Sequence, residues 1–417
     1  MSPGGEGRSN RLLIRDLAQV ATPAGQAAPL RGSDLRAVDL IEDAFVLCEN
    51  GRIASVGPMR ELRRLDGDVE ELDGRGLSAV PGFVDCHTHA CFAGDRVEEF
   101  ALRAAGAGYE ELHAAGGGIL ATVHATREAG EAGLTAALER HAEWMLRAGT
   151  TTFEAKSGYG LDRETELAQL RVIRAAGGVP TWLGAHAVPP EFVERGADGY
   201  IDFLLEDVLP DAAELAEGAD VFLERGAFDV GQARRYLQAC RVAGLELRLH
   251  GDQFTEAGAI PLAIELGARS VDHLESTSAR GVAALAASDV VGVLLPASAL
   301  FLGRLMPPGR ALVDAGAAIA LATDFNPGSA FCESLPLVCS LACTQLRLAP
   351  EEALAACTVN AAHVLARADR KGRLAPGFDA DIVLVSAADW RHLAYHLGGP
   401  VVHAVVRGGR ILRSAPA

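Results

Sequence analysis

Two histidines separated by one residue, His87 and His89, end an apolar run that begins at Val80. Side chains at positions i and i+2 of a strand point to the same face, so the two imidazoles are expected to converge. Converging neutral imidazoles suit a borderline divalent metal such as zinc. An isolated His-x-His pair is more often an accident of composition, so a metal site must be supported by the rest of the chain.

Three more metal-type residues, His250, His273 and Asp324, each end a short apolar run. In a barrel of alternating strands and helices the carboxyl ends of the strands form the catalytic face, so these residues would meet His87 and His89 there. Two alternatives stay open at this point. Asp324 also fits an N-cap of the following helix, and His273 also fits a buried structural histidine.

The predicted ligand set is His87, His89, His250 and Asp324, which leaves room for water or substrate. A bound metal lowers the pKa of water and polarises a carbonyl, and both effects serve hydrolysis. Asp324 is suited to take a proton from the water and pass it to a leaving nitrogen. His273 is either a fifth ligand or a hydrogen-bond partner of the carbonyl oxygen or the water.

Arg96 follows the first histidine pair by seven residues. Its guanidinium can hold a carboxylate through two parallel hydrogen bonds, which would suit an anionic substrate. The alternative is a solvated arginine that pairs with Glu98 or Glu99. Tyr159 and His186, after the second and third expected strands, would also face the site.

A turn with Asn326, Gly328 and Ser329 follows Asp324, and amides in such a turn can bind an anion. Lys156 ends the second expected strand. Related barrels with two metals are bridged by a carboxylated lysine on the fourth strand, and the expected fourth strand here, 220–225, has no lysine. We therefore expect one metal, and a structural or substrate-contacting role for Lys156.

Alternating strands and helices position these residues. The strands are expected near 79–87, 149–156, 180–187, 220–225, 245–250, 270–274, 290–296 and 318–324, with helices between most of them, such as 162–176 and 232–243. This alternation predicts an α/β fold with a TIM-type (β/α)8 barrel over residues 79–365. A doubly wound sheet is the alternative, but it would not so readily gather the ends of strands one, five, six and eight. Gly116–Gly118 suggests a mobile loop over the site or a helix-start turn.

Both ends of the chain are rich in β structure. Residues 44–48 and 52–56 flank Asn50-Gly51, a strong hairpin signal, and 402–412 forms another hairpin around Gly408-Gly409. We therefore predict a small β-sandwich domain built from both termini, residues 1–78 and 366–417.

Composition narrows the function classes. The chain has 417 residues and a net charge of −17, so it is a poor candidate for binding nucleic acid or an anionic membrane surface. No apolar run is long enough to span a membrane, and the first residues do not resemble a signal peptide. The eight cysteines form no CxxC pair, which favours reduced thiols and a cytoplasmic protein.

These segments together resemble the amidohydrolase superfamily. The resemblance covers nearly the whole chain and is carried by PGFVDCHTHACFAGDR, EAKSGYGL, GAHAVPP, HGDQ, VDHLE, LATDFNPGS and GRLAPGFDADIVL. The first motif alone marks only the superfamily. EAKSGYGL, GAHAVPP and ATDFNPGS together are more specific, and resemble the branch that opens the imidazolone ring of 4-imidazolone-5-propanoate in histidine catabolism.

This resemblance implies hydrolysis of a cyclic amide to N-formimidoyl-L-glutamate, with one divalent or trivalent metal, zinc or iron, per chain. It implies metal ligands at His87, His89, His250 and Asp324. His273 would orient the carbonyl or the water. The positions that it aligns with substrate or product contacts are Arg96, Tyr159, His186, Gln253, Asn326, Gly328 and Ser329. Some members carry glutamate in place of Gln253; a glutamine cannot act as a base, so proton transfer is assigned to Asp324.

The expected partner is a small molecule, and barrels of this kind commonly form homodimers. The rivals are another cyclic-amide hydrolase or a ring deaminase on the same scaffold, since fold does not decide specificity. A barrel without catalytic activity that acts as a binding protein is the alternative of another class.

Overall fold

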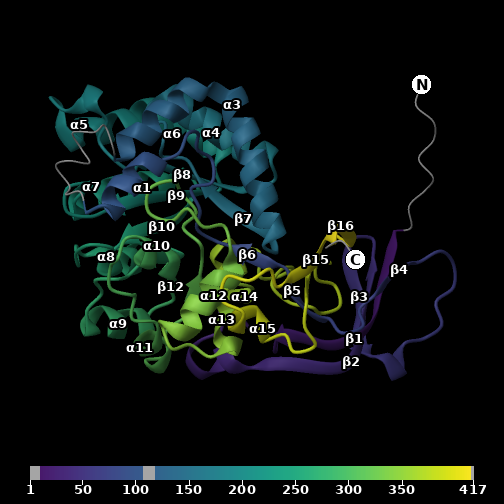
Figure 1. Cartoon of the computed structure of the whole chain (residues 1–417). Coiled ribbons are helices and arrows are strands. Elements are labelled where there is room, and N and C mark those ends of the chain that lie inside the picture. The colour runs from purple at the N-terminus through teal and green to yellow at the C-terminus, as the bar shows by residue number, and fades with distance from the viewer. Residues whose placement is uncertain (1–9, 107–117, 415–417) are drawn as a thin grey trace, which may run out of the picture.

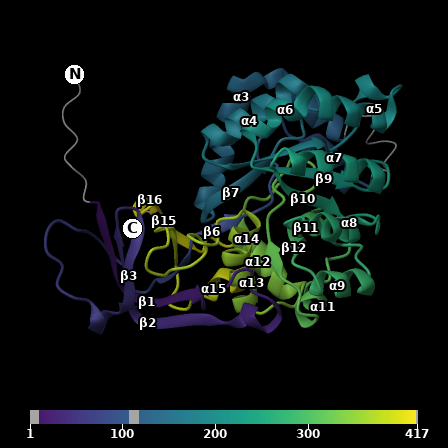
Figure 2. The same cartoon turned by 180° about the vertical axis from the view of Figure 1, so that it is seen from behind.

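The computed structural model describes residues 10–106 and 118–414. Two parts lie side by side, a barrel with its surrounding helices and a sheet to which both ends of the described chain belong (Figures 1 and 2). The expected loop at Gly116–Gly118 lies largely outside the described residues; Gly118 itself precedes helix α3 (Ile119–Arg147) with φ 92°. None of the helices in the described ranges has the length and apolar character needed to cross a membrane.

The predicted barrel is confirmed. Its eight strands follow one another in chain order, and each strand pairs with the next in parallel. The first and last strands approach each other just beyond their ends, where Thr88 forms a parallel bridge with Phe325. This closure excludes the doubly wound sheet. The barrel strands are β6 (Phe83–Asp85), β7 (Thr150–Lys156), β8 (Val179–Ala185), β9 (Gly218–Leu223), β10 (Glu246–Gly251), β11 (Ser270–His273), β12 (Val291–Leu294) and β13 (Ile319–Leu321).

Helices follow the barrel strands and cover the outside of the barrel (Figure 1). Several begin where the sequence supplies a cap: the side chain of Asp162 accepts from the amide of Thr165, and Asp229 forms a capping box with Gln232. Besides α3, the helices are α1 (Val97–Ala104), α4 (Arg163–Ala175), α5 (Gly196–Phe203), α6 (Leu209–Leu215), α7 (Val230–Val242), α8 (Ala259–Leu266), α9 (Ala279–Ala286), α10 (Pro296–Phe301), α11 (Gly309–Asp314), α12 (Leu335–Thr344), α13 (Pro350–Ala356), α14 (Val359–Val364) and α15 (His392–Tyr395).

The small β domain from both termini is also present, as one mixed sheet. Its order is β16-β15-β14-β5-β1-β2-β3, and β4 also pairs with β1. Both expected hairpins form, β2 with β3 and β15 with β16. The strands are β1 (Arg11–Pro23), β2 (Val38–Glu49), β3 (Arg52–Pro58), β4 (Glu70–Asp73), β5 (Ser78–Pro81), β14 (Ile382–Val385), β15 (Val402–Arg407) and β16 (Arg410–Ser414).

The prediction of a single strand at 79–87 is wrong, because this segment contains two strands that belong to different sheets. β5 pairs with β1 and β14 in the terminal sheet, and β6 begins the barrel two residues later. Gly82 lies between them and packs so closely that a Cβ there would lie 2.4 Å from Oγ1 of Thr151. The glycine therefore lets one extended segment pass from the terminal sheet into the barrel, and this segment continues through β6 to the histidine pair.

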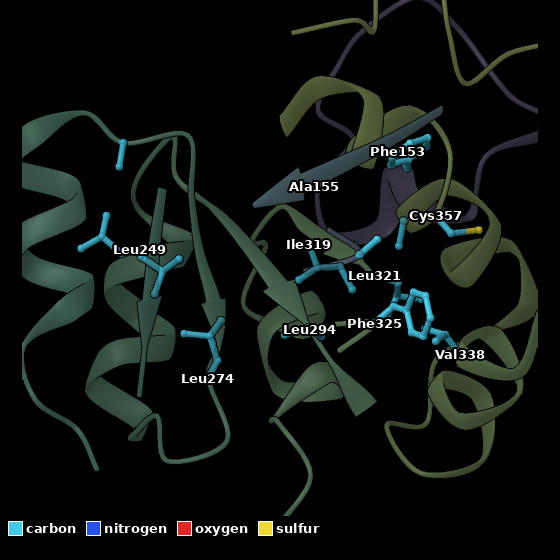
Figure 3. Packing of buried hydrophobic residues seen from close by; sticks show 14 of the residues in the cluster. Phe153, Ala155, Leu249, Leu274, Leu294, Ile319, Leu321, Phe325, Val338 and Cys357 are labelled. Carbon is cyan, nitrogen blue, oxygen red and sulfur yellow. The ribbon is translucent and has the colours of Figure 1, made fainter. Parts of the chain in front are cut away.

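A continuous hydrophobic cluster joins the barrel to its helices. Leu321 of β13, Phe325 after it, Val338 of α12 and Cys357 after α13 belong to this cluster and are almost fully buried (Figure 3). Burial of such side chains contributes about 1.5–3 kcal/mol each. The segment after β13 is thereby fixed by packing on its outer side, while Asp324 within it faces the barrel axis with the histidines.

Candidate metal centre and active site

The predicted metal-type residues converge at the carboxyl ends of the barrel strands. His87 and His89 follow β6, His250 lies in β10, His273 ends β11, and Asp324 follows β13. Each of the five is at most 3% exposed. Asp324 does not cap a helix, since the next helix, α12, starts at Leu335 with Ser334 as its cap. The N-cap alternative for Asp324 is therefore wrong.

The four predicted ligands are linked by short distances between three pairs of them, and His250 and Asp324 fall in different groups of neighbouring donor atoms. Oδ1 of Asp324 is 3.5 Å from Nε2 of both His87 and His89, and Nε2 of His89 is 3.1 Å from Nε2 of His250. Two sets of ligand atoms, His87 with His89 and Asp324, and His87 with His250 and His273, each lie within 4.8 Å of one another. The second set keeps His273 open as a further ligand.

The chemistry of these donors fits a metal ion. Nε2 of His87 is fully buried and has no hydrogen-bond partner among the described residues. Burial, reinforced by the positive charge of Lys156 and neighbouring imidazoles, holds the pKa of His87 and His89 well below the usual range. Burial also lowers the pKa of His250, to about 3. These imidazoles are therefore neutral at pH 7, with lone pairs that a cation between them would accept.

Carboxylates hold the opposite side of two of the imidazoles. Nδ1 of His87 is 2.5 Å from Oδ2 of Asp272, and Nδ1 of His250 is 3.1 Å from Oδ2 of Asp220. The contact of His87 with Asp272 is a hydrogen bond, which fixes the tautomer and the ring orientation of a metal-binding histidine. Asp220 lies beside the His250 ring at ion-pair distance, and its Oδ1 accepts from the backbone amide of His250 at 3.1 Å. Asp220 and Asp272 are fully buried, in β9 and β11. Neither was predicted as a site residue.

His273 has a different electrostatic environment from the other histidines. Burial alone would lower its pKa, but Glu275, whose Oε1 is 3.5 Å from Nδ1, together with Asp324 and Asp272 raises it overall. His273 has φ 87° and the next residue, Leu274, has φ 72°. Positive φ is strained for residues with large side chains, and such strain is concentrated at functional sites. His273 is thus suited to donate a hydrogen bond, whereas the neutral histidines are suited to bind a metal ion.

A cavity of about 540 Å³ opens above these residues. Every predicted substrate contact lines it, together with His89, His250, His273 and Asp324. His87 lies beneath it and is fully buried. Two further lining residues were named from the sequence in other roles, Glu99 as a partner of Arg96 and Gly118 in the loop expected near the site. The lining residues that were not predicted are Arg103, Ile119, Phe222, Phe254 and Leu302.

Arg96 both lines this cavity and pairs with an acidic neighbour. Its Nε and Nη2 donate to Oε2 and Oε1 of Glu99 at 2.8 and 2.6 Å. The pairing with Glu99 is thus observed, but the pair is largely buried at the cavity and not solvated. Arg96 also packs against Gly328, where a Cβ would lie 2.1 Å from its Nη1. A glycine at 328 therefore makes room for the guanidinium four residues after Asp324.

The turn after Asp324 is held by the side chain of Asn326. Its Oδ1 accepts from the amides of Gly328 and Ser329, both at 2.8 Å, and its Nδ2 donates to the Asp324 carbonyl at 2.6 Å. The expectation that these two amides bind an anion is wrong, because they already donate to Asn326. The hydroxyl of Ser329 lies 3.4 Å from Oδ2 of Asp324.

Tyr159 and His186 form one wall of the cavity. The His186 ring stacks on the ring of His89 with centroids 5.3 Å apart, and its Nδ1 lies 2.9 Å from the Gly158 carbonyl oxygen. Burial lowers the pKa of His186 to about 4, so this ring is neutral. The loop that carries Tyr159 is fixed by Glu166 of α4, whose carboxylate accepts from three amides of residues 158–161.

Known proteins are similar to this chain in sequence and in fold. Imidazolonepropionase of Rubrobacter xylanophilus is 59% identical over 96% of this chain and 98% of that protein, and imidazolonepropionase of Chloroflexus aggregans is 46% identical over 96% and 98%. The model of the amidohydrolase family matches residues 78–412. The chain belongs to the amidohydrolase family.

Among solved structures, a triazine hydrolase variant superposes on this amidohydrolase with a TM-score of 0.72 at 18% identity, covering 97% and 95% of the two chains. An adenosine deaminase from Xanthomonas campestris, solved with bound zinc, gives 0.63 at 18% identity, covering 96% and 92%.

Two charged residues inside a buried strand could have drawn attention to the groups beneath the site. Glu154 and Lys156 of β7 are both fully buried, and Nζ of Lys156 is 2.7 Å from Oε1 of Glu154 and 2.8 Å from Oδ2 of Asp220. A strand that buries two ionisable side chains needs partners for them. Lys156 is not among the cavity-lining residues of this amidohydrolase.

Proposed function

We propose that this amidohydrolase hydrolyses the cyclic amide bond of 4-imidazolone-5-propanoate to N-formimidoyl-L-glutamate in histidine catabolism. One observation carries the proposal: the same cavity is lined by buried metal-type donors and by Arg96, which donates two hydrogen bonds to the carboxylate of Glu99. The reaction needs both, because the scissile carbonyl and the propanoate tail belong to one small molecule. The imidazolonepropionase names of the similar proteins support the same substrate.

His87, His89, His250 and Asp324 are the proposed ligands of one metal ion per chain. When bound, the ion supplies positive charge that lowers the pKa of water and polarises a carbonyl. A donor set of three nitrogens and one oxygen accepts zinc or iron. Zinc is favoured by the deaminase of this fold that was solved with bound zinc.

Asp324 is the proposed proton carrier. It takes the proton from the attacking water, the ring carbonyl carbon gains the hydroxyl, and the bond from that carbon to the ring nitrogen breaks. Asp324 then passes the proton to the departing nitrogen, so that one water is consumed and one open-chain product forms. In the protein without a bound ion, burial raises the pKa of Asp324. His273 is proposed to donate to the carbonyl oxygen.

The propanoate tail is proposed to bind Arg96, near the turn that begins at Asp324. Tyr159, His186 and Gln253 are proposed to contact the imidazolone ring. Asn326 and Gly328, with Tyr159, are proposed to contact the ring-opened product, and Ser329 the substrate. Gln253 is 8% exposed and lines the cavity, so an amide hydrogen bond to the ring is available to it.

The chain is further proposed to be cytoplasmic, to act as a homodimer, and to divide into residues 1–78 and 366–417 for the β domain and 79–365 for the barrel. Eight free cysteines, six of them buried, support a reducing compartment.

Loss of the imidazolone chromophore on addition of purified enzyme to freshly made 4-imidazolone-5-propanoate tests the proposal. Turnover with N-formimidoyl-L-glutamate as the product would support it. A competing assay with cyclic ureides and with aminated ring substrates covers the rival activities. Turnover of one of these, with none of the imidazolone, would refute the assignment, and metal analysis with no bound ion would refute the metal centre.

A further inference from the structure

A buried ammonium group lies beneath the proposed metal centre. Lys156 is fully buried, and three carboxylates surround its Nζ: Oε1 of Glu154 at 2.7 Å, Oδ2 of Asp220 at 2.8 Å and Oδ2 of Asp272 at 3.9 Å. Burial alone would lower the pKa of Lys156, but these three acids outweigh it and raise the pKa overall. Lys156 is therefore a cation that touches neither the cavity nor solvent.

Its carboxylate partners are the groups that face the imidazoles. Oδ2 of Asp220 is also 3.1 Å from Nδ1 of His250, and Oδ2 of Asp272 is 2.5 Å from Nδ1 of His87. The same carboxylate oxygen thus faces Lys156 on one side and an imidazole on the other. Asp220 and Asp272 therefore each lie between the ammonium group of Lys156 and an imidazole.

The third imidazole is linked to the same strand through the backbone. Thr88 separates His87 from His89; its amide donates to Oε2 of Glu154 at 3.1 Å, and its carbonyl accepts from the amide of Lys156 at 2.9 Å. Its hydroxyl donates to the carbonyl of Glu154 at 2.6 Å. The end of β7 therefore positions the backbone of the His-x-His pair as well as the partners of the other rings.

We propose that Lys156 is a positioning residue of the metal centre, which holds Asp220 and Asp272 so that His250 and His87 direct their Nε2 atoms to the ion. This inference rests on the proposed metal centre. Three buried carboxylates without a counter-charge could not keep this arrangement, since removal of one partner from a buried ionic group leaves an uncompensated charge. The sequence predicted a structural or a substrate-contacting role for Lys156; the residue does not line the cavity, and the proposal gives the structural role a specific form, the positioning of groups that orient metal ligands.

The test measures zinc affinity of the metal-free protein by competition with a chromophoric chelator. Lys156→Met keeps the length of the side chain and removes its charge. Loss of groups that orient metal ligands typically weakens affinity by roughly 10–100-fold, and we expect a loss of this size. The matched control is Lys371→Met, because Lys371 also bridges two carboxylates, Asp379 at 3.1 Å and Asp381 at 2.6 Å, beside the terminal sheet. The control should bind zinc as wild type does.

A second variant separates positioning from simple charge balance. Glu154→Gln combined with Lys156→Met removes one charge of each sign, and the glutamine oxygen can still accept from the Thr88 amide. If Lys156 positions Asp220 and Asp272, zinc binding stays weak in the double variant, and circular dichroism should show a folded protein. Zinc affinity like wild type in either Lys156 variant, or an equal loss in Lys371→Met, would overturn the inference. Absence of tight zinc or iron binding by wild type would instead refute the proposed metal centre.

Discussion

The pairing of Arg96 with Glu99 gives a quantitative prediction for substrate binding. The guanidinium makes two charge-assisted hydrogen bonds to Glu99, at 2.8 and 2.6 Å. A propanoate tail could make the same pair, and each such bond is worth about 1.5–3 kcal/mol. The tail must displace or share Glu99, so we expect a net contribution of about 2–3 kcal/mol. Arg96→Met, which keeps the aliphatic stem, should therefore raise KM by roughly 30- to 150-fold and leave kcat nearly unchanged.

A cycle of two enzymes and two substrates isolates this interaction. The second substrate carries a propanamide in place of the propanoate, so it lacks the charge that Arg96 would bind. Arg96→Met should change KM for the amide by less than about 3-fold, because most of its effect depends on the carboxylate. Glu99→Gln should lower KM for the carboxylate, since it removes the competing group. An equal loss with both substrates would refute the tail assignment and show that Arg96 acts through the fold of the cavity.

Other residues give predictions of different kinds. Asp324→Asn should fold normally, by circular dichroism, and lose roughly 10²–10⁴-fold in kcat; turnover like wild type would exclude Asp324 as the proton carrier. His250→Ala should lose the bound metal, and full occupancy by mass-spectrometric metal analysis after dialysis would contradict the ligand assignment. Burial would raise the pKa of Glu352, but hydrogen bonds from the Ala349 amide and two arginines lower this pKa overall from its ordinary value of 4.5. The ionised Glu352 therefore stabilises the folded protein above pH 4.5, and this stabilisation is lost as the pH falls through the pKa of the folded state. Glu352→Gln should therefore lower Tm at pH 7, with a difference from wild type that shrinks in acid; a constant difference would contradict this linkage.

Much of the site was predictable because parallel strands in a barrel impose one rule. Polar residues at carboxyl ends meet at the axis, so residues as distant in sequence as His87 and Asp324 could be placed together without coordinates. The same rule placed Tyr159 and His186 at the cavity. Strand order and strand ends are visible in the hydrophobic pattern of the chain, and the positions that depend on them alone are therefore predictable.

Contacts that depend on side-chain packing could not be predicted in this way. Asp220 contacts His250 because β9 and β10 pair in a register that sets His250 opposite Phe222, two residues beyond Asp220, and no pattern in either segment reports that register. Arg96 offered two partners, a substrate carboxylate or a neighbouring acid. The sequence could not show that Glu99 holds it at the cavity, because this depends on how α1 lies over the strand ends.

The acidity of the whole chain and the anionic tail of the proposed substrate are reconciled by local charge. A net charge of −17 repels anions at long range, but this field is screened over about 8–10 Å at physiological salt. Within the cavity, Arg96 and Arg103 supply positive charge and Glu99 offsets part of it. Beneath the cavity the acids are not available to repel the tail, because Asp220 and Asp272 face Lys156 and the imidazoles. The barrel thus separates two charge systems, a buried one that orients metal ligands and an upper one that selects a carboxylated substrate.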